Sequence, residues 1–180
     1  LINSLEGQKG QPRLKPPFYP AAIGLWGQPT IVNNVETLAF VPRVLEIGAE
    51  KFAAMGSPKN GGTALYSLSG NISKPGVYEL SMGTPLMDLL NKYGGGVPNG
   101  RKLKAVIPGG SSSHILTAEE CENLPLDFES VAARGSMLGS AAVMVIDDSV
   151  SIPKLMHWMV RFYAHESCGQ CTPCREGTDW

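Results

Sequence analysis

Short stretches of alternating or continuous apolar residues in the middle of the chain predict strands. Residues 64–69 and 77–80 flank a Lys-Pro-Gly turn, and this arrangement predicts a β-hairpin. Two more apolar runs, at 103–107 and 141–146, have the length of further strands. All four lie within about half of the chain.

One helix is expected between these strands. Thr84 is a candidate N-cap, and Pro85 suits the first helical position because proline needs no amide partner there. Gly94 is a natural C-terminal stop. Four apolar residues recur between them at helical spacing: Leu86, Leu89, Leu90 and Tyr93. A hairpin, a helix and further strands predict an α+β roll of the ubiquitin-like, β-grasp type over residues 63–150.

The segment before this unit, residues 1–55, is proline-rich at its centre. The run P-R-L-K-P-P-F-Y-P excludes a regular helix or a central strand there. Asn34 is a plausible N-cap of a following helix, whose apolar face would carry Val35, Leu38 and Ala39. Pro42 should kink or end that helix. The glycine-rich residues 56–62 read as a linker.

The segment after it, residues 151–180, begins with another helix. Ser151 can cap it, and it should end near Glu166. Its apolar stripe consists of Ile152, Leu155, Met156, Met159 and Tyr163. Thr172 and the proline after it repeat the cap-plus-proline pattern, which would place Cys174 in the first turn of a new helix.

Composition supports a folded protein without a charged binding surface. Hydrophobic residues make up 43% and charged residues 17%, which suffices for a buried core. The net charge of −1 and the lack of long like-charge runs argue against nucleic acid or an anionic membrane as a partner. There is no bilayer-length apolar stretch and no signal region, so direct membrane insertion and export are not expected. The start at Leu1 and the incomplete ligand set described next suggest a fragment of a larger chain.

The strongest chemical signal is the run E-S-C-G-Q-C-T-P-C-R-E-G-T. Its cysteines, Cys168, Cys171 and Cys174, have the spacing C-x2-C-x2-C and can supply three corners of an iron–sulfur cluster. A compact ferredoxin run would place a fourth cysteine where this chain has Thr178. Such clustering indicates a metal site in a reducing compartment rather than a disulfide framework.

Two other chemistries fit some of these residues. A Cys3His zinc site could use His165 or His157, although structural zinc more often draws on two separated ligand pairs. A redox-active C-x-x-C pair would leave the third cysteine unexplained. Cys121 could be a fourth ligand, but its acidic neighbours oppose an anionic cluster, and a packed free thiol is the preferred interpretation.

The cysteine run, together with R-L-K-P-P-F and V-N-N-V-E-T-L, resembles the flavin- and NADH-binding subunit of respiratory complex I. Related proteins include the diaphorase subunits of NAD-linked hydrogenases and formate dehydrogenases. The resemblance covers essentially the whole chain. It implies the C-terminal part of an FMN/NADH-binding domain at 1–55, a soluble-ligand-binding β-grasp (SLBB) domain at 63–150 and the start of a helical 4Fe–4S domain at 151–180.

The resemblance also implies roles for particular residues. The three clustered cysteines match ligands of the 4Fe–4S cluster, whose fourth cysteine would lie beyond Trp180. Lys15 and Phe18 match positions near bound NADH, and Tyr19 is an extra residue relative to the usual P-P-F-P. FMN contacts match Val32, Asn33, Asn34 and Thr37. Without the resemblance, the asparagines would be read as helix caps and Lys15 as a solvated charge.

The implied function is that of an NADH dehydrogenase, which transfers hydride from NADH to FMN and electrons to the cluster towards quinone. No catalytic side chain is implied, because the flavin carries the hydride chemistry, and the fragment alone should be inactive. Implied partners are other peripheral-arm subunits, especially a 2Fe–2S thioredoxin-like subunit and a large iron–sulfur subunit. The location would be the cytoplasmic or mitochondrial matrix side, peripheral to the membrane. Two alternatives remain: the same module in a hydrogenase or formate dehydrogenase, and a non-enzymatic zinc or scaffold module.

Overall fold

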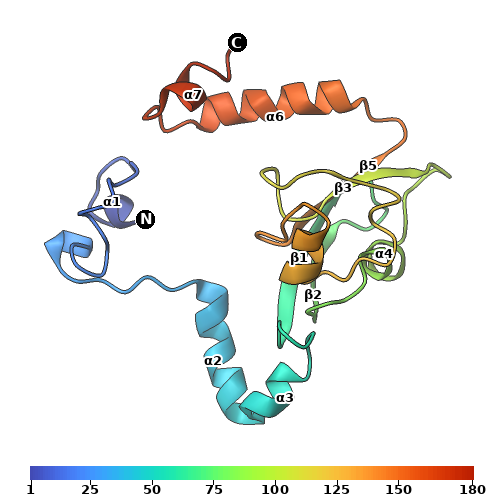
Figure 1. Cartoon of the computed structure of the whole chain (residues 1–180), viewed down its shortest axis with the longest axis horizontal. Helices are drawn as coiled ribbons and strands as arrows, with labels where there is room; N and C mark the ends of the chain where they lie inside the picture. Colours follow the sequence, from blue (N-terminus) through green and yellow to red (C-terminus); the bar gives the residue numbers. More distant parts are fainter. The chain divides into compact units, whose positions relative to one another are not determined.

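The structure is a computed structural model that describes all residues, 1–180 (Figure 1). The chain forms two compact units: Arg43–Ser151, and Leu1–Pro42 together with Ile152–Trp180. No helix in either unit has the length and apolar character needed to cross a membrane.

A five-stranded mixed sheet organises the central unit. Its strand order is β2-β1-β5-β3-β4, with β1 antiparallel to β2 but parallel to β5, and with β3 antiparallel to both β5 and β4. This order, with the first and last strands side by side and parallel, confirms the predicted β-grasp type. The strands are β1 (Thr63–Gly70), β2 (Gly76–Ser81), β3 (Leu103–Ile107), β4 (Leu116–Thr117) and β5 (Ala142–Asp147).

One face of the sheet carries the core. In β1, the buried Tyr66 and Leu68 alternate with exposed neighbours, as expected for a strand with one solvated face. The hydroxyl of Tyr66 donates to the carbonyl of Leu126 at 2.8 Å, so its buried polar group is satisfied. Burial, and secondarily the carboxylate of Asp127, raises the pKa of Tyr66 to about 12.

The helix packed on this core begins with α4 (Leu86–Asp88) and continues as a π-helical turn, η2 (Leu89–Tyr93). Its predicted apolar positions Leu86, Leu89 and Leu90 are buried. The predicted N-cap Thr84 is wrong: Pro85 holds the cap position, and the Thr84 hydroxyl donates to the carbonyl of Ser81 at 2.7 Å. The helix therefore begins one residue later than its sequence pattern suggests.

Gly94 follows the π-helical turn as its C-cap, as predicted. A Cβ atom at this position would lie 2.7 Å from a side-chain carbon of Leu68 and 2.8 Å from one of Ile72. The φ of Gly94, −74°, is available to any residue. Close packing, and not backbone conformation, therefore requires glycine at this position.

Several short elements carry no clear sequence signal. They include α5 (Phe128–Ala133), where the carboxylate of Asp127 caps the helix by accepting the N–H of Ser130 at 2.7 Å. The others are α1 (Ile2–Leu5), η1 (Leu25–Gly27) and α3 (Ala49–Ala53), in addition to the two-residue strand β4.

The predicted flanking helices are present. α2 (Val35–Ile47) starts directly after Asn34 but continues through Pro42. α6 (Ile152–Glu166) ends at the expected residue. In α7 (Thr172–Arg175) the N-cap is Cys171 rather than Thr172, while Cys174 does lie in the first turn, as expected.

We predict that residues 63–150 fold on their own, because they contain the whole sheet and its core. Leu86→Ala should lower the free energy of unfolding of this piece by about 2–5 kcal/mol, since Leu86 is fully buried. The control Val77→Ala, at an exposed strand position, should change it much less. Thermal unfolding followed by circular dichroism measures both. If 63–150 shows no cooperative transition while 43–151 does, the domain begins upstream of residue 63.

Candidate functional site

The three clustered cysteines lie on the loop after α6 and on α7. Figure 1 shows this part of the chain near the C-terminus. Cys168, Cys171 and Cys174 are all exposed free thiols. Gly169 adopts a left-handed backbone, with φ of +78°, and its N–H bonds to the Ser167 hydroxyl at 3.1 Å. This glycine allows the loop to turn sharply between the first two cysteines.

Arg175 fixes the path of the cysteine loop. Its Nη1 donates to the carbonyls of Gly169 at 2.7 Å and Gln170 at 3.3 Å, and its Nε bonds to Glu176 at 2.9 Å. The guanidinium therefore joins the backbone between Cys168 and Cys171 to the helix that carries Cys174. It also places a positive charge beside the loop.

The thiols are accessible but do not converge on one point. No group of three or more His, Cys, Asp or Glu side chains is arranged to hold a metal ion, so neither a cluster site nor a Cys3His site is assembled. The Nε2 atom of His165 lies 3.8 Å from a carboxylate oxygen of its neighbour Glu166. The donor chemistry nevertheless fits an iron–sulfur group, because three accessible thiols on a short loop are the ligands that such groups use.

Cys121 has a different environment. It is fully buried in the core of the central unit, with its sulfur 4.0 Å from the carbonyl of Leu116. Burial first, and then the charge of Glu120, raises its pKa to about 12, although Arg134 opposes the shift. The prediction of a packed free thiol is confirmed. A sulfur in this state is protonated and enclosed, which is the opposite of what a metal ligand requires.

The residues matched to FMN contacts lie at the start of α2. Val32, Asn33, Asn34 and Thr37 are all exposed. The carbonyl of Asn34 accepts the first helical bond, from Leu38 at 3.1 Å, so Asn34 occupies the N-cap position by its backbone. Asn34 and Thr37 are three residues apart, which places them as neighbours on the helix surface.

The residues matched to NADH contacts lie on the proline-rich segment. Phe18, about two-fifths exposed, lines a hollow of about 470 Å³. Lys15 is exposed and does not line it. The hollow is otherwise formed by Asn3, Glu6, Gln8, Pro12, Arg13, Leu14, Ile23, Gly24 and Gly27.

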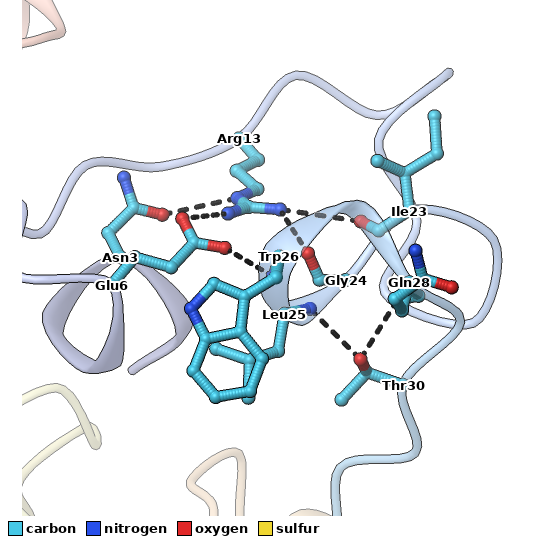
Figure 2. A network of polar contacts seen from close by, with 9 residues as sticks. All are labelled: Asn3, Glu6, Arg13, Ile23, Gly24, Leu25, Trp26, Gln28 and Thr30. Carbon is cyan, nitrogen blue, oxygen red and sulfur yellow. Dashed lines mark hydrogen bonds and ion pairs between the residues drawn. The ribbon is translucent and has the colours of Figure 1, made fainter.

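Sequence reasoning did not identify the polar network beside this hollow. Figure 2 shows the guanidinium of Arg13 between the side chains of Asn3 and Glu6 and the backbone carbonyls of Ile23 and Gly24. No spacing rule links an arginine to partners seven to eleven residues away in irregular backbone. Only the folded loop brings them together.

Two family models match the chain. An SLBB domain matches residues 64–145, and the NADH-ubiquinone oxidoreductase-F iron–sulfur binding region matches residues 154–180. The class of protein is therefore one in which an SLBB domain precedes an iron–sulfur binding region.

Whole-chain comparisons identify individual relatives. The chain is 53% identical to the second F-type subunit of the NADH-quinone oxidoreductase of Rhizobium meliloti (strain 1021) and 52% identical to the F-type subunit of the Mycobacterium bovis enzyme. Each match covers 100% of this chain, but only 42% and 40% of the relatives. The resemblance that the sequence motifs indicate is confirmed along the whole chain, as similarity to these F-type subunits.

A solved structure supports the same relation. The chain matches a chain of an NAD+-reducing NiFe-hydrogenase in the air-oxidized state with a TM-score of 0.84 and 40% sequence identity. The match covers 99% of this chain and 30% of the hydrogenase chain. Segments similar to this chain thus occur both in F-type subunits of NADH-quinone oxidoreductase and in a chain of an NAD+-reducing hydrogenase.

We predict that the four thiols fall into two reactivity classes. In the native, metal-free protein at pH 8, a small aromatic disulfide reagent should modify the three exposed cysteines within minutes and Cys121 only after denaturation. Absorbance of the released thiolate counts the reacted groups. Cys121→Ser should leave the fast class unchanged and remove the slow thiol. Rapid modification of all four groups in native protein would show that Cys121 is accessible.

Burial of Cys121 also predicts a pH dependence. The ordinary pKa of the thiol is 9.0 and the folded value is about 12, so the folded state holds the proton more tightly. The protonated thiol of Cys121 therefore adds to the free energy of unfolding. This stabilisation is fully present below pH 9 and is lost as the pH rises from 9 towards 12. Urea unfolding between pH 8 and 11 should show a shallower decline in Cys121→Ala than in the parent. An equal decline of the free energy of unfolding with pH in the parent and in Cys121→Ala would contradict the raised pKa of Cys121.

Proposed function

We propose that this chain is part of an NADH dehydrogenase flavoprotein that takes hydride from NADH onto FMN and passes electrons through a 4Fe–4S cluster towards quinone. The observation that carries the proposal is the exposed cysteine loop within the region that matches the iron–sulfur family model. The high identity to the NADH-quinone oxidoreductase relatives along the whole chain supports it.

Cys168, Cys171 and Cys174 would hold the cluster, which supplies one-electron transfer when bound. Arg175 would hold their loop in shape and offset the negative charge of the thiolates, through its bonds to the carbonyls of Gly169 and Gln170. The burial of Cys121 supports a fourth ligand from a part of the protein outside residues 1–180.

The flavin-facing residues would bind rather than react. Asn33, Asn34 and Thr37 offer neutral donors and acceptors, which suit the heteroatoms and hydroxyls of FMN. Lys15 offers a cation for the nucleotide, and the exposed ring of Phe18 offers a face for stacking. No side chain needs to act as an acid, base or nucleophile, since FMN supplies the hydride chemistry when bound.

The setting would be a multi-subunit complex. We propose peripheral-arm partners, namely a 2Fe–2S thioredoxin-like subunit and a large iron–sulfur subunit, on the cytoplasmic or matrix side of the membrane. The hydrogenase match at 40% identity supports a second candidate, the diaphorase module of an NAD-linked hydrogenase or formate dehydrogenase. Identities above 50% to quinone-linked relatives favour the first candidate. Rotenone- or piericidin-sensitive NADH oxidation by the purified complex would distinguish quinone reduction from hydrogen metabolism.

We predict that each clustered cysteine is required for the iron centre and that Cys121 is not. In the full-length protein, Cys168→Ser, Cys171→Ser and Cys174→Ser should each lower bound iron and the reduced cluster's electron paramagnetic resonance signal severalfold, because serine is a poor ligand for this soft centre. Cys121→Ser is the matched control and should retain both. Loss of the signal in Cys121→Ser, with the fold intact by circular dichroism, would make Cys121 the fourth ligand.

We also predict that residues 1–180 alone bind FMN negligibly, because the few exposed contacts at α2 cannot offset the cost of association, several kcal/mol. In the full-length protein, Asn34→Ala should reduce the FMN content after dialysis, measured by flavin fluorescence of the denatured extract. Arg43→Ala, a change at an exposed surface pair on the same helix, is the control and should retain FMN. Micromolar FMN binding by residues 1–180 would contradict the assignment of the site.

A further inference from the structure

Arg13 lies at the start of the segment that carries Lys15 and Phe18, and its guanidinium reaches across to the end of that segment. Nη1 donates to the carbonyls of Ile23 at 3.3 Å and Gly24 at 3.5 Å. One side chain therefore closes residues 13–24 into a loop, which we call the strap. Backbone bonds within the strap, from Phe18 to Leu14 at 3.1 Å and from Ile23 to Tyr19 at 2.8 Å, shape the interior of the loop.

The opposite side of the same guanidinium anchors the strap to α1. Nε donates to Oδ1 of Asn3 at 3.1 Å, and Nη2 donates to Oε2 of Glu6 at 3.4 Å. The Arg13 and Glu6 side chains are only 23% and 14% exposed. The surface pair Arg43–Glu46, by comparison, is 56% and 66% exposed. A partly buried pair with several further hydrogen bonds is screened less by solvent than such a surface pair.

Glu6 holds a third piece of backbone with its other oxygen. Oε1 accepts the N–H of Trp26 at 2.7 Å (Figure 2). Trp26 has a φ of +50°, a left-handed conformation that is strained for a bulky residue. The turn that follows the strap is thus kept in an unfavourable geometry by the same carboxylate that binds Arg13.

The network borders the hollow that Phe18 lines. Arg13 and Glu6 both contribute to the wall of this hollow, as do Ile23 and Gly24, whose carbonyls Arg13 holds. Movement of the guanidinium would therefore release both ends of the strap and change the shape of the hollow at the same time. The exposed Lys15 lies two residues from this anchor.

We propose that Arg13, supported by Glu6, is a positioning residue for the nicotinamide nucleotide: it holds the strap so that Lys15 and Phe18 are presented together. This inference rests on the proposed role of those two residues in NADH binding. Arg13 has its donors directed to Asn3, Glu6 and the two strap carbonyls, so it acts through the strap.

The test uses the full-length protein in its purified complex, with NADH as the substrate and ferricyanide as the acceptor. The variants are Arg13→Ala, Arg13→Lys and Glu6→Gln, with Arg43→Ala as an exposed arginine control. Lys15→Ala and Phe18→Ala are measured in the same series. The readouts are KM and kcat, the Kd for NADH by calorimetry, FMN content, and hydrogen exchange at the amides of Phe18 and Ile23.

Arg13→Ala should raise KM and Kd for NADH about five- to tenfold, while kcat and FMN content change little. This magnitude is typical of residues that act on a ligand through neighbouring residues. Hydrogen exchange in the strap should accelerate. Arg13→Lys should restore part of the affinity, because an ammonium keeps the charge but lacks the planar fork that joins several acceptors. Glu6→Gln should have a smaller effect in the same direction, since the amide oxygen can still accept the Trp26 N–H. Arg43→Ala should match the parent.

Faster strap exchange with unchanged KM and Kd in Arg13→Ala would overturn the inference, provided that Lys15→Ala and Phe18→Ala raise KM. If those two variants also leave KM unchanged, the proposed nucleotide role of the strap fails together with the inference. If Arg13→Ala does not assemble, unchanged KM and Kd in both Arg13→Lys and Glu6→Gln would overturn it.

Discussion

The parallel pairing of β1 with β5 is the contact on which the central unit depends. It joins residues 67–70 to residues 142–145, which are far apart in the sequence. The first and last strands of the unit therefore lie side by side and share one core. Tyr66, Val143 and Val145 are buried along this seam. The same core encloses Cys121, which removes this cysteine from metal chemistry. Strand pairing thus accounts for the burial of Cys121, whereas the three cysteines on the loop after α6 and on α7 are exposed.

The sequence predicts the parts of this unit that depend on apolar periodicity. The hairpin, β3, β5 and the buried face of the helix at Leu86 are where their apolar patterns indicate. The apolar sequence pattern does not locate features that depend on contacts between residues far apart in the sequence. β4 has two residues and exists only because β3 provides an edge for it. The helix cap moves from Thr84 to Pro85 because the N–H of Leu86 bonds to the distant carbonyl of Leu124.

The residues of the candidate site also include some that a local sequence pattern identifies and others that only long-range contacts bring together. The cysteine spacing is a local signal, and it identifies the loop and the first turn of α7 without any knowledge of the fold. The Arg13 network is not local, since its partners lie on α1 and at the far end of a proline-rich loop. Ligand residues and the side chains that position them therefore need different kinds of reasoning. If cofactors carry the chemistry, the remaining task of the chain is positioning, and buried or partly buried polar contacts perform it.

We propose that the exposed cysteines hold iron rather than zinc. X-ray absorption at the iron and zinc edges, on full-length protein purified anaerobically, distinguishes the two metals. We expect iron surrounded by sulfur, with a second scattering shell from neighbouring iron atoms, and with both shells lost in Cys171→Ser but kept in Cys121→Ser. Stoichiometric zinc with sulfur and nitrogen neighbours, and no iron–iron shell, would contradict it.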